Sequence, residues 1–360
     1  MSIEKWKLVA INLLVCFVLF NFLYWSVPTL NYLLTVSTAS GVTDDPRARL
    51  PNYANVTWAP QLYREAAQLR MDYKSFIGWR RAPFHGETIN VGGPYAQRLT
   101  INRGMNKSKK VYFFGGSTMW GAAVRDDATI PSQFAAATGI WSENFGEFSY
   151  TAHQSLMLLV QLLQDGHRPD IVVFYHGGND VADKCRSELT PNSDDREAQI
   201  DDLLKNSQDK FSFHVYFAGF RAAAAWIRYE ITRVVAPARA GRSYDCDSNP
   251  EKAIKIAQNL LADWKIAEQL VASYGGRFVG ILEPNLFFSK TRHDHIRDNP
   301  ALRAQFQAVY PLVERLMTED DALYNMVSAL DVDDYVYVDI SHFSPNGTAL
   351  IAARMAEIIK

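Results

Sequence analysis

The sequence lacks a surplus of basic residues, and this argues against a nucleic-acid-binding protein. Its 37 Lys and Arg residues stand against 39 Asp and Glu residues, which gives a formal net charge of −2. Surfaces that bind nucleic acid are normally basic, because they neutralise phosphates. The chain also has no internal repeat and no long low-complexity tract, so neither a solenoid nor a disordered tail is expected. Its 360 residues suffice for two domains, or for one domain with an insertion.

Cysteine is scarce as well. Only Cys16, Cys185 and Cys246 occur, and none has the spacing of a metal-ligand motif, so we predict neither a metal nor another cofactor. Cys16 lies in an apolar run and is expected to serve as a small apolar residue. In an oxidising compartment Cys185 and Cys246 can form a disulfide. Two free, buried thiols are the alternative.

Charged residues are absent from positions 8 to 43. Within this stretch residues 8–27 are almost wholly apolar, and about 20 such residues cross a bilayer as a helix. Tyr24 and Trp25 suit the lipid–water interface, and Pro28 ends the helix. The alternatives are a buried core helix and a signal peptide cleaved after residues 37–39. Because the apolar run is too long and that site too distant for a signal peptide, we favour an uncleaved transmembrane signal anchor.

The flanking charges predict the orientation of this anchor. Lys5 and Lys7 precede the span, and the next basic residue is Arg47. The positive-inside tendency places the N-terminal tail in the cytoplasm and the chain after about residue 30 outside it. We therefore predict a single-pass protein of the cytoplasmic membrane, anchored through residues 8–27, whose main domain is periplasmic.

The chain divides into three predicted parts. Residues 1–27 are the cytoplasmic tail and anchor, and residues 28–104 are a linker and lead-in hairpins that pack beside the main domain. Residues 105–360 are the main domain. A helical insertion interrupts it at about residues 183–249, with a charged helix near residues 195–206. The insertion can serve as a substrate lid or as a purely structural cover.

Short apolar runs alternate with helical patterns through the main domain. The predicted buried strands are residues 111–114, 171–175, 278–282 and 335–338. Helices are expected at residues 152–165 and 250–274, and Ser344-Pro345 begins a final helix. This alternation predicts a three-layer α/β domain with a mostly parallel sheet. In such sheets the active site lies at the carboxyl ends of the strands.

Three polar motifs follow the predicted strands. Ser117 completes a Gly-Gly-Ser turn, Asn179 belongs to a Gly-Gly-Asn-Asp turn, and Asp339 lies three residues before His342. The glycines allow a sharp turn that presents the serine hydroxyl. A carboxylate at this spacing can fix the tautomer of the imidazole, whose other nitrogen then faces the serine. Each motif alone is also compatible with a structural loop; their common placement after buried strands indicates catalysis.

Together these motifs resemble the first, third and fifth conserved blocks of the SGNH (GDSL-like) hydrolase family, over about residues 110–182 and 275–360. The resemblance implies a flavodoxin-like α/β/α fold and hydrolysis or transfer of acyl esters without a metal. It assigns Ser117 as nucleophile, His342 as general base and Asp339 as its partner. Asn179 and the backbone N–H of Ser117 would donate hydrogen bonds to the oxyanion.

The sequence departs from the family pattern at two positions. Gly116 stands where an Asp usually precedes the nucleophile. Ser149 stands where the second block usually supplies a glycine whose N–H completes the oxyanion hole. A serine keeps that N–H, so Ser149 remains a predicted donor, but the tighter turn that glycine permits is not guaranteed.

Three further residues are candidates for the substrate pocket. Trp120 follows the nucleophile turn, while His153 and His176 flank the other motif loops. Histidines at such positions are also compatible with packed or solvent-facing side chains.

The sequence therefore favours a serine esterase that acts on acyl esters, O-acetyl esters included, of an extracytoplasmic glycan. Two alternatives remain. The same acyl-serine intermediate can be transferred to a sugar hydroxyl by an O-acyltransferase, or the chain can be a non-catalytic, anchored binding or scaffold protein. The expected partners are an acylated substrate and the membrane, and no nucleic acid.

The orientation of the anchor is testable with a topology reporter. An enzyme reporter that is active only after export, fused after Thr43, should be active because the flanking lysines keep the N-terminus inside. A matched cytoplasmic reporter at the same position should be silent. The reverse pair of signals would contradict the predicted orientation.

Overall fold

The computed structural model describes residues 45–102, 106–193, 243–318 and 320–359, together with residues 6–7, 11–19, 22, 196–197, 200–201 and 204. Half of the predicted anchor, residues 8–10, 20–21 and 23–27, lies outside the described residues, and so does most of the predicted insertion. The prediction that the insertion forms a lid or cover is therefore not tested. Among the residues that are described, no helix is long and apolar enough to cross a membrane. The elements below belong to one compact unit, Asp44–Ser193 with Tyr244–Lys360.

An eight-stranded sheet organises this unit, in the order β10-β9-β8-β6-β7-β5-β4-β3. The strands from β10 to β7 pair in parallel, whereas β7, β5, β4 and β3 pair antiparallel. The parallel strands are β6 (Asn106–Gly115), β7 (Ile140–Asn144), β8 (Ile171–His176), β9 (Arg277–Leu282) and β10 (Leu323–Asn325). The antiparallel ones are β3 (Phe84–His85), β4 (Asn90–Gly92) and β5 (Gln97–Arg98).

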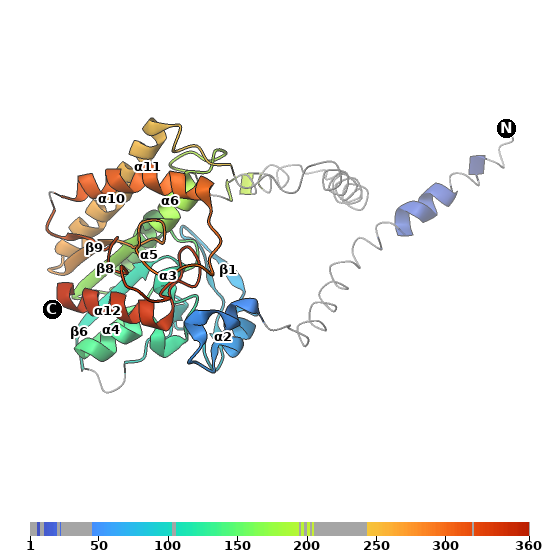
Figure 1. The fold of residues 1–360 in the computed structure, drawn as a ribbon. Helices are drawn as coiled ribbons and strands as arrows, with labels where there is room; N and C mark the ends of the chain where they lie inside the picture. Colours follow the sequence, from blue (N-terminus) through green and yellow to red (C-terminus); the bar gives the residue numbers. More distant parts are fainter. Residues whose placement is uncertain are drawn as a thin grey trace. The chain divides into compact units, whose positions relative to one another are not determined.

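Helices cover both faces of the parallel part of the sheet (Figure 1). One layer contains α5 (Ala152–Gln164), α6 (Gly178–Lys184), α10 (Pro250–Ala272) and α11 (Pro300–Met317), and the other contains α4 (Ile130–Thr138) and α12 (Pro345–Ile359). The predicted three-layer α/β architecture with a mostly parallel sheet is therefore confirmed. The remaining elements are α2 (Ala59–Ala66), α3 (Ser117–Trp120), the hairpin β1 (Met71–Lys74) with β2 (Gly78–Arg81), and the 3-10 turns η1 (Pro46–Arg49), η2 (Pro51–Tyr53) and η3 (Asp126–Ala128).

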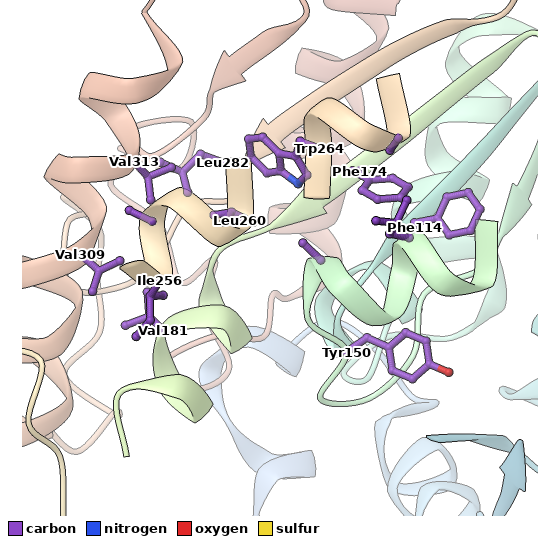
Figure 2. Packing of buried hydrophobic residues seen from close by; sticks show 14 of the residues in the cluster. Phe114, Tyr150, Phe174, Val181, Ile256, Leu260, Trp264, Leu282, Val309 and Val313 are labelled. Atoms are coloured by element: carbon purple, nitrogen blue, oxygen red, sulfur yellow. The ribbon is translucent and has the colours of Figure 1, made fainter. Parts of the chain in front are cut away.

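The apolar runs of the central strands explain the two layers. Every residue of β8 is buried, and successive side chains of a strand point to opposite faces. Val172 and Phe174 accordingly pack under α5 and α10, whereas Val173 and Tyr175 pack under α4 and α12. Figure 2 shows the first of these clusters, with the Trp264 indole of α10 above the strands that carry Phe114 and Phe174. Burial on both faces fixes the register of the strands and so the positions of their carboxyl ends.

The long helices begin at capping residues, at the predicted positions for α5, α10 and α12, whereas α11 was not predicted. Asn249 and Asn299 each accept a hydrogen bond from the N–H three residues on, and a proline follows each at the first helical position. Thr151 and Gln154 form a capping box at the start of α5. The final helix, predicted from Ser344-Pro345, is α12, and the Ser344 hydroxyl accepts a hydrogen bond from Gly347 N–H at 3.2 Å.

The lead-in region is more closely tied to the sheet than predicted. Only the hairpin of β1 and β2 is a separate two-stranded sheet. Strands β3 to β5 extend the main sheet, because β5 pairs with β7 through Arg98 and Asn144. The Arg98 guanidinium secures this edge from within the core, where its Nε lies 2.5 Å from the Asp126 carboxylate. Residues 84–98 therefore belong to the main domain, which we predicted to begin at residue 105.

The predicted last strand, residues 335–338, is wrong. These residues make only an isolated bridge, between Tyr337 and Phe343, and the edge strand is β10. Val336 and Tyr337 are buried because the segment folds back on itself over α12, not because it lies in the sheet, and Val338 packs against the lead-in region. Val338 N–H donates to the His342 carbonyl at 2.8 Å, and Ser344 N–H donates to the Val336 carbonyl at 2.9 Å. The result is a tight turn that contains residues 339–342.

Cys185 and Cys246, the pair that the sequence favoured, are joined by a disulfide across 61 residues. The bridge links the end of α6 to the segment before α10. Both residues are buried in the same cluster as these helices.

Replacing both cysteines by alanine should lower the free energy of unfolding by about 4 kcal/mol, because the bridge restricts a long loop in the unfolded chain. The measurement is denaturant unfolding of the wild type and the double variant, with Cys16→Ala as the control that should change nothing. Peptide mapping without reductant provides the direct check, and two free thiols in it would contradict the pairing.

Candidate active site

The nucleophile candidate, Ser117, lies where β6 turns into the short helix α3. This turn needs glycine at position 115, because a Cβ there would lie 2.6 Å from the Met119 Cβ and 2.7 Å from the Tyr175 carbonyl oxygen. Ser117 is the first residue of α3, and the first N–H groups of a helix have no acceptor within the helix. The turn therefore presents both the Ser117 hydroxyl and its N–H at the carboxyl end of the central strand.

The structure brings the three predicted triad residues together. His342 Nε2 lies 2.7 Å from Ser117 Oγ, and His342 Nδ1 lies 2.7 Å from Asp339 Oδ2. The other carboxylate oxygen of Asp339 accepts hydrogen bonds from the N–H groups of Ser341 and His342, both at 2.9 Å. Thr118 Oγ1 donates to the Ser341 carbonyl at 3.2 Å and so ties α3 to the histidine turn. Such an arrangement can activate a serine hydroxyl through a base that a carboxylate orients.

The environment of Asp339 keeps its carboxylate ionised. Burial raises the pKa of this group, but the charge of His342 and the hydrogen bonds from its ring and from two backbone N–H groups outweigh burial and lower the pKa to about 2. The carboxylate therefore stays a hydrogen-bond acceptor throughout the physiological pH range. It can hold His342 Nδ1 protonated and stabilise a positive charge on the ring.

The turn after β8 places Asn179 beside the nucleophile turn. Its Nδ2 donates to the Tyr150 carbonyl at 3.0 Å, and the same nitrogen lies 2.4 Å from the point that a Cβ on Gly116 would occupy. The amide therefore lies directly against the residue before Ser117. A side-chain amide and a backbone N–H at such positions are neutral donors suited to a developing oxyanion.

Ser149 adopts a backbone conformation that glycine occupies more readily than other residues. Its φ of 58° lies in the left-handed region, and the residue is exposed. A non-glycine residue there costs about 1–2 kcal/mol. The neighbouring Tyr150 carbonyl is the acceptor for Asn179, so this strained turn adjoins the predicted oxyanion site. The tight turn thus persists with serine in place of glycine.

A cavity of about 240 Å³ adjoins the triad. Its wall combines His342 and Asp339 with residues from the lead-in region and from the loop that contains Phe148. Small and apolar side chains form much of the remaining surface, and two arginines contribute charge. The full lining is Asp45, Arg47, Tyr63, Ala66, Ala67, Leu69, Arg81, Ala122, Ala123, Phe148, Val338, Asp339 and His342.

The residues predicted to line the pocket lie elsewhere. Trp120 is fully buried, with the Arg98 guanidinium 4.1 Å from its ring. His153 is an exposed residue of α5, and its Nδ1 lies 3.0 Å from Asp263 Oδ1. His176 ends the buried strand β8, where burial lowers its pKa to about 3 and keeps it neutral. None of the three contributes to the cavity beside the triad, because the motif loops turn these side chains into the core or toward α10.

Sequence reasoning missed the contribution of the lead-in region to this cavity. Arg47 forms an ion pair with Asp45 and lies over the Tyr63 ring, while Arg81 lies over the Phe148 ring. No local pattern relates these residues to the distant triad motifs. For metals, the described part of the chain contains no group of three or more His, Cys, Asp or Glu side chains that could hold an ion.

No protein-family model and no curated protein matches this chain. Solved structures do resemble it, among them a putative lipolytic protein of the G-D-S-L family from Desulfitobacterium hafniense DCB-2, at 11% identity and a TM-score of 0.39 over 70% of this chain and 99% of that one. An acetyl xylan esterase, AlAXEase, matches at 12% identity and a TM-score of 0.40, over 70% and 100%. A carbohydrate acetylesterase family member from Sinorhizobium meliloti matches at 14% identity and a TM-score of 0.35, over 70% of this chain and 97% of that one.

Similarities of this size do not assign an activity. In the structure, Ser117, Asn179, Asp339 and His342 lie together at the carboxyl edge of the parallel sheet. This is the arrangement that the resemblance to SGNH hydrolases implied.

The contact between Gly116 and Asn179 gives a direct test of this geometry. Gly116→Ala should lower kcat for p-nitrophenyl acetate by about 10- to 100-fold with little change in KM, because the new Cβ displaces the Asn179 amide. Gly92→Ala is the matched control, since a Cβ there meets nothing within 4 Å. A folded Gly116→Ala variant with wild-type kcat would contradict this placement of Asn179.

Proposed function

We propose that this protein is a serine esterase that hydrolyses acyl esters, O-acetyl esters of an extracytoplasmic glycan in particular. The observation that carries the proposal is the continuous hydrogen-bonded chain from Asp339 through His342 to Ser117 Oγ, with 2.7 Å at both contacts of the imidazole. Asn179 beside Gly116 adds a donor at the position where an oxyanion would form.

In the acylation half of the reaction, Ser117 Oγ attacks the ester carbonyl carbon while His342 Nε2 takes the hydroxyl proton. Asp339 stabilises the imidazolium that results. The carbonyl oxygen becomes an oxyanion that accepts hydrogen bonds from the Ser117 N–H, Asn179 and the Ser149 N–H. The C–O bond to the alcohol then breaks, His342 returns the proton to the leaving oxygen, and an acyl-serine remains.

Deacylation repeats these steps with water. His342 Nε2 takes a proton from the water molecule as its oxygen attacks the acyl carbon, and the same donors hold the second oxyanion. The bond to Ser117 Oγ then breaks, the proton returns to Oγ, and the carboxylic acid leaves. The ester and one water molecule are consumed, the alcohol and the carboxylic acid are released, and Ser117 and His342 return to their starting states.

The cavity beside His342 and Asp339, whose lining does not include Ser117, favours a polar alcohol as the part of the substrate that it would hold. Its volume of about 240 Å³ is below the roughly 300–1,000 Å³ of sites that enclose drug-sized ligands. Its wall alternates small apolar side chains with the Arg47–Asp45 ion pair and Arg81, which suits a sugar ring with apolar C–H faces and hydroxyl edges. The glycan and its periplasmic location rest on the predicted anchor at residues 8–27.

Activity measurements separate the esterase from its two alternatives, an O-acyltransferase and a non-catalytic binding or scaffold protein. A scaffold protein needs no aligned triad, so the intact geometry favours an enzyme. An acyltransferase would use the same acyl-serine but pass the acyl group to a sugar hydroxyl. Product analysis with and without an added glycan acceptor distinguishes the two enzymes: release of free acid that the acceptor does not change supports hydrolysis.

The triad itself is tested by single and double substitutions. Ser117→Ala and His342→Ala should each lower kcat by about 10⁶-fold, and the double variant should be little worse, because the two residues act as a unit. Asp339→Ala should lower kcat by a smaller factor, since Asp339 orients and stabilises the ring without transferring the proton. The assay is hydrolysis of p-nitrophenyl acetate by the purified protein.

Labelling by a fluorophosphonate probe gives an independent readout that needs no natural substrate. The wild type should be modified at Ser117, and the Ser117→Ala variant should not react. Full esterase activity in Ser117→Ala would eliminate the proposed mechanism. Unfolding curves that match the wild type establish that lost activity reflects chemistry and not misfolding.

A further inference from the structure

A buried carboxyl group that the proposed mechanism does not use lies behind the turn that carries Asn179. Glu283 directly follows β9 and is 7% exposed. Its Oε1 accepts a hydrogen bond from the Gly178 N–H at 2.6 Å. A Cβ on Gly178 would lie 2.6 Å from the same oxygen, so glycine is needed for this approach. The backbone of the residue just before Asn179 is thus held directly by a side chain from the neighbouring strand.

The position of Glu283 is itself fixed from two sides. Its own N–H donates to the His176 carbonyl at 3.0 Å, which continues the pairing of β8 and β9 past their ends. Its carbonyl accepts a hydrogen bond from the Tyr310 hydroxyl of α11 at 3.2 Å. A rigid sheet edge and a helix therefore support the carboxyl group that contacts the turn.

Asp180 holds the other side of the same turn. Its Oδ2 accepts a hydrogen bond from the Gly177 N–H at 3.3 Å, and its Oδ1 accepts one from the Ala152 N–H at 3.0 Å. The latter bond reaches the start of α5, directly after the loop whose Tyr150 carbonyl receives the Asn179 amide. Two buried carboxyl groups thus fix the three residues that surround Asn179 in the chain.

We propose that Glu283 is a positioning residue, which holds Asn179 against Gly116 through its hydrogen bond with the Gly178 N–H. This inference rests on the proposed function, because it assigns Glu283 a role through the oxyanion donor of that reaction. Asn179 makes its catalytic contact only when charge develops on the substrate oxygen. A loosened turn should therefore lower kcat and leave substrate binding nearly unchanged.

The protonation state of Glu283 adds a pH signature. Burial raises its pKa to about 8, and the Asp180 carboxylate acts in the same direction, against the lowering by the Gly178 N–H. The group is therefore mainly neutral at pH 7 and ionises as the pH rises through about 8. The other titratable groups around it are His176, kept neutral by burial, and the hydroxyls of Tyr175, Tyr310 and Tyr337, whose pKa values burial raises. A new negative charge here opposes the negative oxyanion.

The test compares pH profiles of kcat and KM on p-nitrophenyl acetate between pH 6 and 9.5, with Ser117→Ala as the blank for spontaneous hydrolysis. In the wild type, kcat should fall as the pH rises through about 8. Glu283→Gln keeps an acceptor for Gly178 but cannot ionise, so its kcat should not fall in that range. Glu283→Leu removes the acceptor and should lose about 10- to 100-fold in kcat at pH 7, with KM near the wild-type value.

The matched control is Asp126→Asn, which alters a buried carboxylate outside the site, bound to Arg98. This change should lower stability and keep the wild-type pH profile. A wild-type kcat in Glu283→Leu would overturn the positioning role, and an unchanged fall above pH 8 in Glu283→Gln would overturn the assignment of the pH dependence to Glu283. If Glu283→Leu does not fold, Glu283→Ala, which also removes the acceptor, decides in its place. A wild type without any esterase activity would instead refute the proposed function, so the two failures are distinguishable.

Discussion

The hydrogen bond between His342 Nε2 and Ser117 Oγ joins residues 225 positions apart, and everything else at the site depends on it. Ser117 is fixed by the centre of the sheet, since β6 pairs with β7 on one side and β8 on the other. His342 is fixed by a turn outside the sheet, which α12 and the Asp339 carboxylate hold in place. An error of about 1 Å between these two supports is enough to impair such a reaction by about 10²-fold. The close-packed core on both faces of the sheet provides that precision.

Much of this arrangement could be predicted from the sequence because a strand that is buried on both faces leaves a short, wholly apolar run. The runs around Phe114, Phe174 and Ile281 are short and apolar, and all three are strands of the parallel sheet. Polar turn motifs follow the first two. The same pattern led to a wrong strand prediction at residues 335–338. These residues are apolar because part of the segment packs against α12, and they do not pair as a strand. Periodicity reports burial, and burial alone does not distinguish a strand from a packed turn. The prediction that Asp339 and His342 lie near Ser117 did not depend on this strand, because the turn after residue 338 positions both residues.

The walls of the cavity were beyond such reasoning. Trp120 and His176 stand next to motif residues in the chain, yet local chain direction turns both into the core. Arg47 and Tyr63 precede the nucleophile by more than fifty residues and carry no local signal of their contact with the site. The pairing of β5 with β7 attaches the lead-in region to the sheet. Sequence motifs can therefore identify reacting groups, whereas specificity depends on tertiary contacts between distant segments.

Glu283 and Asp180 hold the turn that carries Asn179 in place, and burying their carboxyl groups lowers the stability of the folded protein. An ionised carboxylate is costly to bury, and the two side chains lie behind the same turn, where the charge of Asp180 further raises the pKa of Glu283. The raised pKa of about 8 leaves Glu283 largely neutral near pH 7, which avoids most of that cost while its oxygen still accepts the Gly178 N–H. An apolar residue would avoid the remaining cost, but it would leave that N–H without its acceptor and release the turn beside Asn179. The polar group is thus explained by the geometry of the turn that carries Asn179 and not by the stability of the core.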